Sequence, residues 1–312
     1  MSREKLSRWG GPVAKRRFIL YIALLFVVTV ATNFVAARAG GLPASSFFIM
    51  CSPALAAIVA SILTRRSLKA IGWRPWPVKW LAAGWVLPIL YAFPAYALVW
   101  ITGLGSVPNP TFLERARLIL DMPTEPNWVV IVAAFGFISI VNLLPAMIFS
   151  LGEEIGWRGF LVPELTKWVG FRKACLLSGV IWSAWHLPGV IAGSYGSSGT
   201  PLAYQLACFT AMVIATGVVL AWLRMKSGSI WPAAIMHATH NGIIQAFFGP
   251  ITADTGLTRY FTGEFGIALV PFTLALAWIC WRRAGDAEIT SAEGRGGAVA
   301  EPEPTVSPRP SN

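Results

Sequence analysis

The chain has 312 residues, of which 55% are hydrophobic and only 12% are charged, and its mean hydropathy is +0.62. This composition lies outside that of soluble globular proteins and predicts an all-α, polytopic integral membrane protein. The net charge of +11 does not indicate a nucleic-acid-binding protein, because the basic residues lie between apolar runs and not on one solvated face. The four cysteines are isolated in apolar segments, so their spacing predicts neither a zinc site nor a disulfide framework.

Apolar stretches near the length that a bilayer requires recur along the chain. We place eight candidate membrane helices, at about 18–37, 47–63, 80–103, 128–150, 174–193, 202–223, 230–248 and 265–281. Between the third and the fourth, the sequence FLERARLIL lies between prolines and predicts a short helix on the membrane surface.

The predicted spans divide the chain into five parts. A basic tail (1–17) precedes a group of membrane helices with an external loop (18–127), a core that carries most of the polar clusters (128–248), and a last loop and membrane helix (249–284). The remaining residues, 285–312, are polar with almost no large apolar side chains, so we expect a disordered tail.

Lysine and arginine prefer cytoplasmic loops, so their distribution predicts the orientation. With the eight spans, 21 of the 25 basic residues fall on one side of the membrane and four on the other. We therefore expect a multi-pass protein of the cell membrane with both termini in the cytoplasm.

A pair of acids lies in an apolar setting at the end of the fourth predicted span. An ionisable side chain in hydrocarbon costs roughly 2.5–3.5 kcal/mol on insertion scales, so such residues are usually retained for a function. Glu154 and Arg158 are four residues apart and are expected to form an ion pair on one helix face, leaving Glu153 to point elsewhere. Gly152 and Gly156 have the spacing that lets a second helix approach closely.

The chain has three histidines, and each lies in an apolar stretch. Trp182 and His186 are four residues apart on the fifth predicted span, and His237 and Asn241 are four apart on the seventh. A single histidine in a membrane helix is more often a hydrogen-bonded packing residue, and we favour that interpretation for His240. Helix rise places Glu153, His186 and His237 between the cytoplasmic face and the middle of the membrane, so one cavity can hold them.

A carboxylate, imidazoles and an amide in one cavity are the parts that hydrolysis requires. Glu153 can take a proton from water, a histidine can hold that water directly or through a divalent metal, and Asn241 can donate to an oxyanion. The chain has no HExxH or GxSxG motif, so neither the soluble zinc-protease route nor the serine-hydrolase route is supported.

Three segments together resemble the motif series of the CPBP family of membrane proteins, which comprises type II CAAX prenyl endopeptidases and bacteriocin-processing or self-immunity proteins. They are EEIGWRGFLVPEL, LLSGVIWSAWHLP and SGSIWPAAIMHATHN, which follow the order EExxxR, FxxxH and HxxxN, and the similarity covers about 128–246. Trp182 stands where the family pattern has phenylalanine. Because both residues are aromatic, we expect this difference to affect the shape of the substrate site more than catalysis.

The resemblance implies an intramembrane metalloprotease of helical fold that cleaves a membrane-associated or prenylated peptide, such as a CAAX tail or a bacteriocin-like peptide. It assigns catalysis to Glu153, His186, His237 and Asn241. A divalent metal, most simply zinc, would be held by His186, His237 and Glu153, although a metal-free glutamate mechanism fits the same residues. Support of the site is expected from Glu154, Arg158, Trp182 and His240.

Two other functions remain open at this point. A non-catalytic immunity or scaffold protein would use the polar cluster to assemble helices or bind a partner. A transporter or proton relay also places Glu and His inside the membrane. It is disfavoured because the polar residues gather toward one side and no matching set runs through the first three spans.

Overall fold

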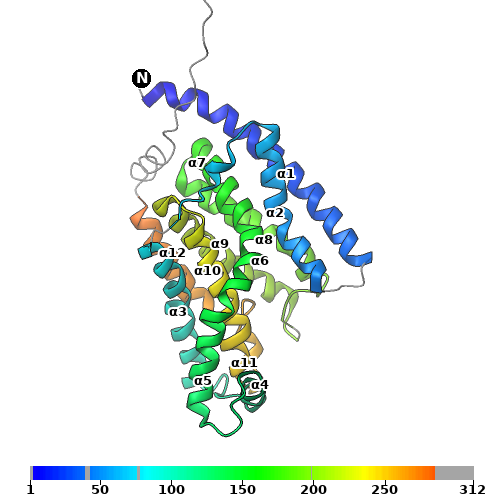
Figure 1. Ribbon diagram of the computed structural model, residues 1–312, viewed down its shortest axis with the longest axis vertical. Coiled ribbons are helices and arrows are strands. Elements are labelled where there is room, and N and C mark those ends of the chain that lie inside the picture. The colour runs from blue at the N-terminus through cyan, green and yellow to red at the C-terminus, as the bar shows by residue number, and fades with distance from the viewer. Residues whose placement is uncertain (1–2, 39–42, 76–77, 198, 285–312) are drawn as a thin grey trace, which may run out of the picture.

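The computed structural model describes residues 3–38, 43–75, 78–197 and 199–284, so the expected disordered tail at 285–312 lies outside the described residues. The described chain is helical throughout, apart from connecting loops (Figure 1). The elements are α1 (Arg3–Arg38), α2 (Pro43–Leu63), η1 (Leu68–Ile71), α3 (Val78–Ile101), α4 (Pro110–Leu120), α5 (Asn127–Gly136), η2 (Phe137–Val141), α6 (Leu143–Gly156), η3 (Trp157–Leu161), α7 (Val162–Val169), α8 (Phe171–Ile191), α9 (Leu202–Ser227), α10 (Trp231–Asn241), η4 (Gly242–Phe248), α11 (Gly249–Ile251), η5 (Thr258–Tyr260) and α12 (Leu269–Arg283).

The helices support a multi-pass membrane protein, with fewer complete spans than the eight expected. Within the described residues, four helical segments are long and apolar enough to cross a membrane, and a fifth is possible if a pair bent by 44° counts as one span. The four are Gly11–Val35, Val78–Ile101, Phe171–Ile191 and Leu202–Ser227, and the bent pair is Asn127–Val141 with Leu143–Val169.

The other three expected spans, 47–63, 230–248 and 265–281, fall on shorter helical segments. The apolar part of α2 covers Phe47–Leu63, and α10 gives way to the π-helical turn η4 after 11 residues. α12 has 15 residues because a loop at 252–268 precedes it. The apolar stretches were therefore located correctly, but hydropathy does not register where a helix changes its hydrogen-bonding pattern or yields to a loop.

The structure also describes most of the predicted basic tail and the predicted short surface helix. α1 begins at Arg3, so the described part of the expected basic tail is helical and continues into the first expected span. The short helix expected from FLERARLIL is α4, which begins after the side chain of Asn109 accepts a hydrogen bond from the backbone N–H of Thr111.

The bundle is organised around α9, which is largely buried and packs against α8, α10 and α12. α10 also contacts α3 and α6, and α2 contacts α6. α1 and α2 lie side by side on one flank, while α7 and α4 lie at opposite ends of the molecule (Figure 1). This arrangement brings α6, α8 and α10, which carry the three sequence clusters, around a common interior.

The close helix approach expected from Gly152 and Gly156 is confirmed, and the partner is α2. A Cβ atom added to Gly152 would lie 2.9 Å from Sγ of Cys51, and one added to Gly156 would lie 2.5 Å from Cβ of Pro53. Glycine at these positions lets the backbones of α2 and α6 meet beside the acid pair.

Replacing Gly156 by alanine is expected to destabilise the protein by about 1–3 kcal/mol, because the new methyl group overlaps Pro53 in a packed helix crossing. Thermal unfolding in detergent measures the effect. Gly136→Ala is the matched control, since a Cβ there meets nothing within 4 Å and the helical backbone accepts alanine. Equal unfolding temperatures for the two variants would contradict the close contact.

Candidate active site

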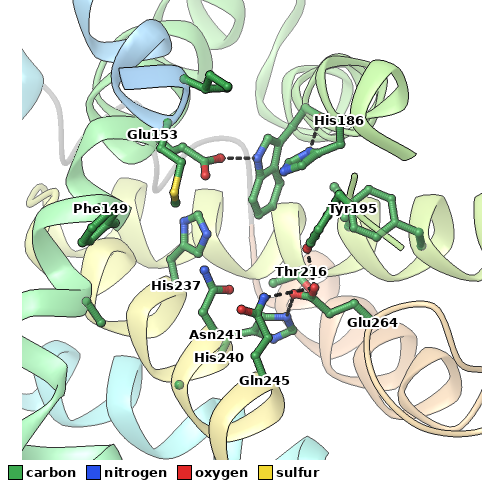
Figure 2. Close-up of a pocket in the computed structure, with 18 of the residues that line it drawn as sticks. Phe149, Glu153, His186, Tyr195, Thr216, His237, His240, Asn241, Gln245 and Glu264 are labelled. Carbon is green, nitrogen blue, oxygen red and sulfur yellow. Dashed lines mark hydrogen bonds and ion pairs between the residues drawn. The ribbon is translucent and has the colours of Figure 1, made fainter. Parts of the chain in front are cut away.

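A cavity of about 740 Å³ lies between the helices that carry the sequence clusters, and the four residues expected to be catalytic line it (Figure 2). Trp182 and His240 line it as well, whereas Glu154 and Arg158 lie behind its wall. The wall is formed by Asn33, Ile49, Met50, Asn142, Pro145, Ala146, Phe149, Glu153, Trp182, Trp185, His186, Gly189, Ser194, Tyr195, Phe209, Met212, Val213, Thr216, His237, His240, Asn241, Gly242, Gln245, Ala246 and Glu264.

Glu153 is held at the cavity by two indole groups. Its Oε2 atom accepts hydrogen bonds from Nε1 of Trp157 at 3.1 Å and from Nε1 of Trp182 at 2.7 Å. Glu153 is 2% exposed, and among the described residues both hydrogen bonds of its carboxylate are made by Oε2, which leaves Oε1 without a partner. Trp182 thus contributes a donor that the phenylalanine of the family pattern lacks. Tryptophan in place of phenylalanine therefore adds a hydrogen bond to the Glu153 carboxylate, in addition to the expected effect on the shape of the substrate site.

His186 is oriented by its own helix and by aromatic packing. Its Nδ1 atom lies 2.9 Å from the backbone oxygen of Trp182, one turn earlier in α8. Since a carbonyl oxygen can only accept, Nδ1 is the donor, and a neutral His186 presents the lone pair of Nε2. Trp185 and Phe209 contact the ring, with centroids 4.8 and 5.2 Å from that of His186.

His237 is oriented by the second acid of the pair. Its Nδ1 atom lies 2.9 Å from Oε1 of Glu154, which also accepts a hydrogen bond from Arg158 at 2.7 Å. The expected Glu154–Arg158 ion pair is therefore confirmed, and both side chains are fully buried. Glu154 has an additional contact that the sequence pattern does not reveal, since it holds His237 so that a neutral ring presents Nε2.

Asn241 lies one turn beyond His237 and lines the same cavity, with its amide beside the imidazole (Figure 2). Helix α10 ends there, and the π-helical turn η4 begins at Gly242. A second π-helical turn, η3, follows the acid pair and begins at Trp157, one of the two donors to Glu153. π-Helical turns are frequent at functional sites because the extra residue redirects neighbouring side chains.

His240 does not have a free ring nitrogen for a metal or substrate in this arrangement. Its Nδ1 atom bonds the hydroxyl of Tyr91, and its Nε2 atom lies 3.1 Å from Oε1 of Glu264. The hydrogen-bonded packing histidine that the sequence favours is what the geometry shows, and its supporting role stays a prediction. Sequence reasoning missed Glu264, Tyr195 and Gln245, although Glu264 is an acid among apolar residues in FTGEFG and carries the same signal as the acid pair.

The three predicted metal ligands, Glu153, His186 and His237, all line the cavity. The atoms left for a ligand are Oε1 of Glu153 and Nε2 of His186 and His237, which are donors that zinc accepts. Among the described residues, however, no three histidine, cysteine or acidic side chains lie close enough together to hold a metal ion. The residues do not fit a metal site in this arrangement, and the metal stays a prediction from the resemblance.

Comparison with known proteins agrees with the motif series. Residues 126–243 match the family described as type II CAAX prenyl endopeptidase Rce1-like. The chain is also similar to CAAX prenyl protease 2 of Methanococcus maripaludis, with 30% identity over 123 residues, which cover 38% of this chain and 44% of that protein.

The matched segment contains the three sequence clusters and most of the cavity wall. Through this segment the chain is similar to the Rce1-like type II CAAX prenyl endopeptidases. The chain spans less than half of the length of this curated relative, and the similarity rests on the part of the chain that forms α5–α10.

Proposed function

We propose that this protein is an intramembrane endopeptidase that hydrolyses a peptide bond in a membrane-associated substrate. The observation that carries the proposal is the convergence of Glu153, His186, His237 and Asn241 on one cavity inside an apolar helical bundle. Glu153 has one carboxylate oxygen without a partner among the described residues, and both histidines are held through Nδ1. These are the features expected of a general base with a second acceptor beside it for the other hydrogen of a water molecule.

In the proposed reaction, Oε1 of Glu153 takes a proton from water as the water oxygen bonds to the carbonyl carbon of the substrate. The second hydrogen of the water is donated to Nε2 of His186 or of His237, and this hydrogen bond orients the water. The former carbonyl oxygen becomes an oxyanion, and the Asn241 amide N–H donates to it. When the carbon–nitrogen bond breaks, the protonated Glu153 returns its proton to the leaving nitrogen, giving a carboxylic acid and an amine.

The proposed substrate carries a lipid or an apolar peptide segment next to the scissile bond. Ile49 and Met50 of α2 and Phe149 of α6 line the cavity beside Glu153, and such a wall favours an apolar ligand. The relative's name, CAAX prenyl protease 2, supports a prenylated peptide as the first candidate. With the basic residues facing the cytoplasm, the substrate would be a cytoplasmic peptide tail at the membrane.

The test is cleavage of fluorogenic peptides by the purified chain in lipid vesicles, with matched prenylated and unmodified peptides. We expect the prenylated peptide to be cut faster, and Asn241→Ala to lower kcat by about 100- to 1000-fold, the usual cost of losing an oxyanion donor. Cleavage measured before and after treatment with a chelator tests the metal prediction in the same assay. Activity that is unchanged in Asn241→Ala, His186→Ala and His237→Ala would overturn the proposed function.

A further inference from the structure

The cavity has a second carboxylate, Glu264, which the proposed hydrolysis does not use. It comes from the loop at 252–268 between α11 and α12 and is 7% exposed. Its Oε1 atom lies 3.1 Å from Nε2 of His240, and its Oε2 atom accepts hydrogen bonds from Nε2 of Gln245 at 3.1 Å and from the hydroxyl of Tyr195. Figure 2 shows these side chains gathered on one side of the cavity, apart from Glu153.

Both oxygens of Glu264 are therefore occupied by side chains of the protein. His240 uses its other ring nitrogen to bond Tyr91 of α3. Because the polar atoms at the centre of this network are satisfied by one another, the network is suited to hold segments of the chain together and not to bind a cation or substrate. The segments it joins are α3, α10 with η4, the loop at 252–268 and the stretch that follows α8.

Tyr195 connects this network to His186. The two ring centroids are 5.7 Å apart, and Phe209 packs against both rings, at 5.6 Å from Tyr195 and 5.2 Å from His186. Phe265, next to Glu264 in sequence, lies 5.1 Å from the ring of Tyr195. The only polar contact of the His186 ring among the described residues is with the backbone of its own helix, so its orientation depends on this packing.

We propose that Glu264 is a positioning residue that holds Tyr195 against His186 and, through His240, ties this arrangement to the helix that carries His237 and Asn241. His186 and His237 belong to helices that are separate in sequence, and Glu264 fixes one relative to the other. The expected effect on turnover rests on the proposed function. The coupling between Glu264 and His186 is a structural property and does not depend on the proposed function.

The coupling can be measured without activity, because the chain has three histidines and each lines the cavity. Histidine-selective 13C labelling should give three ring signals, which single His→Ala variants assign. In Glu264→Ala we expect the His240 signal to shift through direct contact and the His186 signal to shift through Tyr195. The His237 signal, held by Glu154, should move least. Tyr195→Phe removes only the hydroxyl and should reproduce the His186 shift.

Kinetics on a cleaved peptide give a second readout. Glu264→Ala and Tyr195→Phe should each lower kcat by about 10- to 100-fold with little change in KM, as expected when an orienting partner of a catalytic group is lost. The double variant should be no slower than Glu264→Ala alone, because that change already removes the hydrogen bond of Tyr195. Glu264→Gln should lie closer to the wild type, since its amide oxygen still accepts from Tyr195. Tyr204→Phe is the matched control, because that hydroxyl bonds the backbone oxygen of Tyr260 outside the cavity.

A His186 signal that stays in place in Glu264→Ala would overturn the inference, as would additive losses of kcat in the double variant. A kcat for Glu264→Gln as low as that for Glu264→Ala would instead assign proton transfer to Glu264 and would also overturn a positioning role. If the wild type cleaves no peptide, the proposed function fails by itself, and the three histidine signals still decide the coupling.

Discussion

Glu153→Gln is expected to lower the kcat of peptide cleavage by at least about 100-fold, because the loss of a general base has an effect of this size. The amide oxygen of glutamine can still accept from the indoles of Trp157 and Trp182, so the side chain keeps its place. The amide nitrogen then stands in the position of Oε1 and cannot take a proton from water. The measurement is kcat in the vesicle assay, together with the unfolding temperature.

Two comparisons make this result specific. Glu114→Gln changes an exposed acid of α4 that does not line the cavity, and it should leave both kcat and the unfolding temperature unchanged. Glu153→Gln should share that unfolding temperature while losing activity. If Glu153→Gln retained cleavage within a few fold of the wild type, Glu153 could not be the base, and the acid would have only a packing role between two tryptophans.

The site residues that could be predicted from the sequence are the ionisable residues that lie in apolar stretches. Ionisable groups in apolar helices are costly, so Glu153, His186 and His237 could be found without a structure, and helix periodicity separated Glu153 from Glu154. The same periodicity correctly predicted the ion pair of Glu154 with Arg158 and the close approach at Gly156. Each of these inferences uses contacts within one helix turn or the identity of a small residue.

Contacts between distant segments could not be predicted in this way. The bond between His237 and Glu154 joins residues 83 apart, and that between Tyr91 and His240 joins residues 149 apart. Both depend on how α10 lies against α6 and α3, which no local pattern specifies. The π-helical turns and the loop before α12 were missed for a related reason, because hydropathy averages over a window and is insensitive to the hydrogen-bond register.

Glu154 has two partners, and their roles can be separated. Glu154→Ala is expected to cost about 3–5 kcal/mol of stability, because it leaves the fully buried guanidinium of Arg158 without its carboxylate. The stacking of Arg158 on the ring of Trp182, at 4.2 Å, does not replace that charge. Thermal unfolding and the yield of folded protein in detergent measure the loss.

The double variant Glu154→Leu with Arg158→Met removes both buried charges and should restore the unfolding temperature to near that of the wild type, as apolar replacement of a buried ion pair commonly does. It should not restore cleavage. His237 has then lost the acceptor for its Nδ1–H, so its Nε2 is no longer fixed toward the cavity, and kcat should stay about 10- to 100-fold below the wild type. Recovery of both stability and turnover would show that Glu154 serves only to neutralise Arg158. Recovery of stability alone would show that Glu154 has two roles: it neutralises the buried charge of Arg158, and it orients His237 for catalysis.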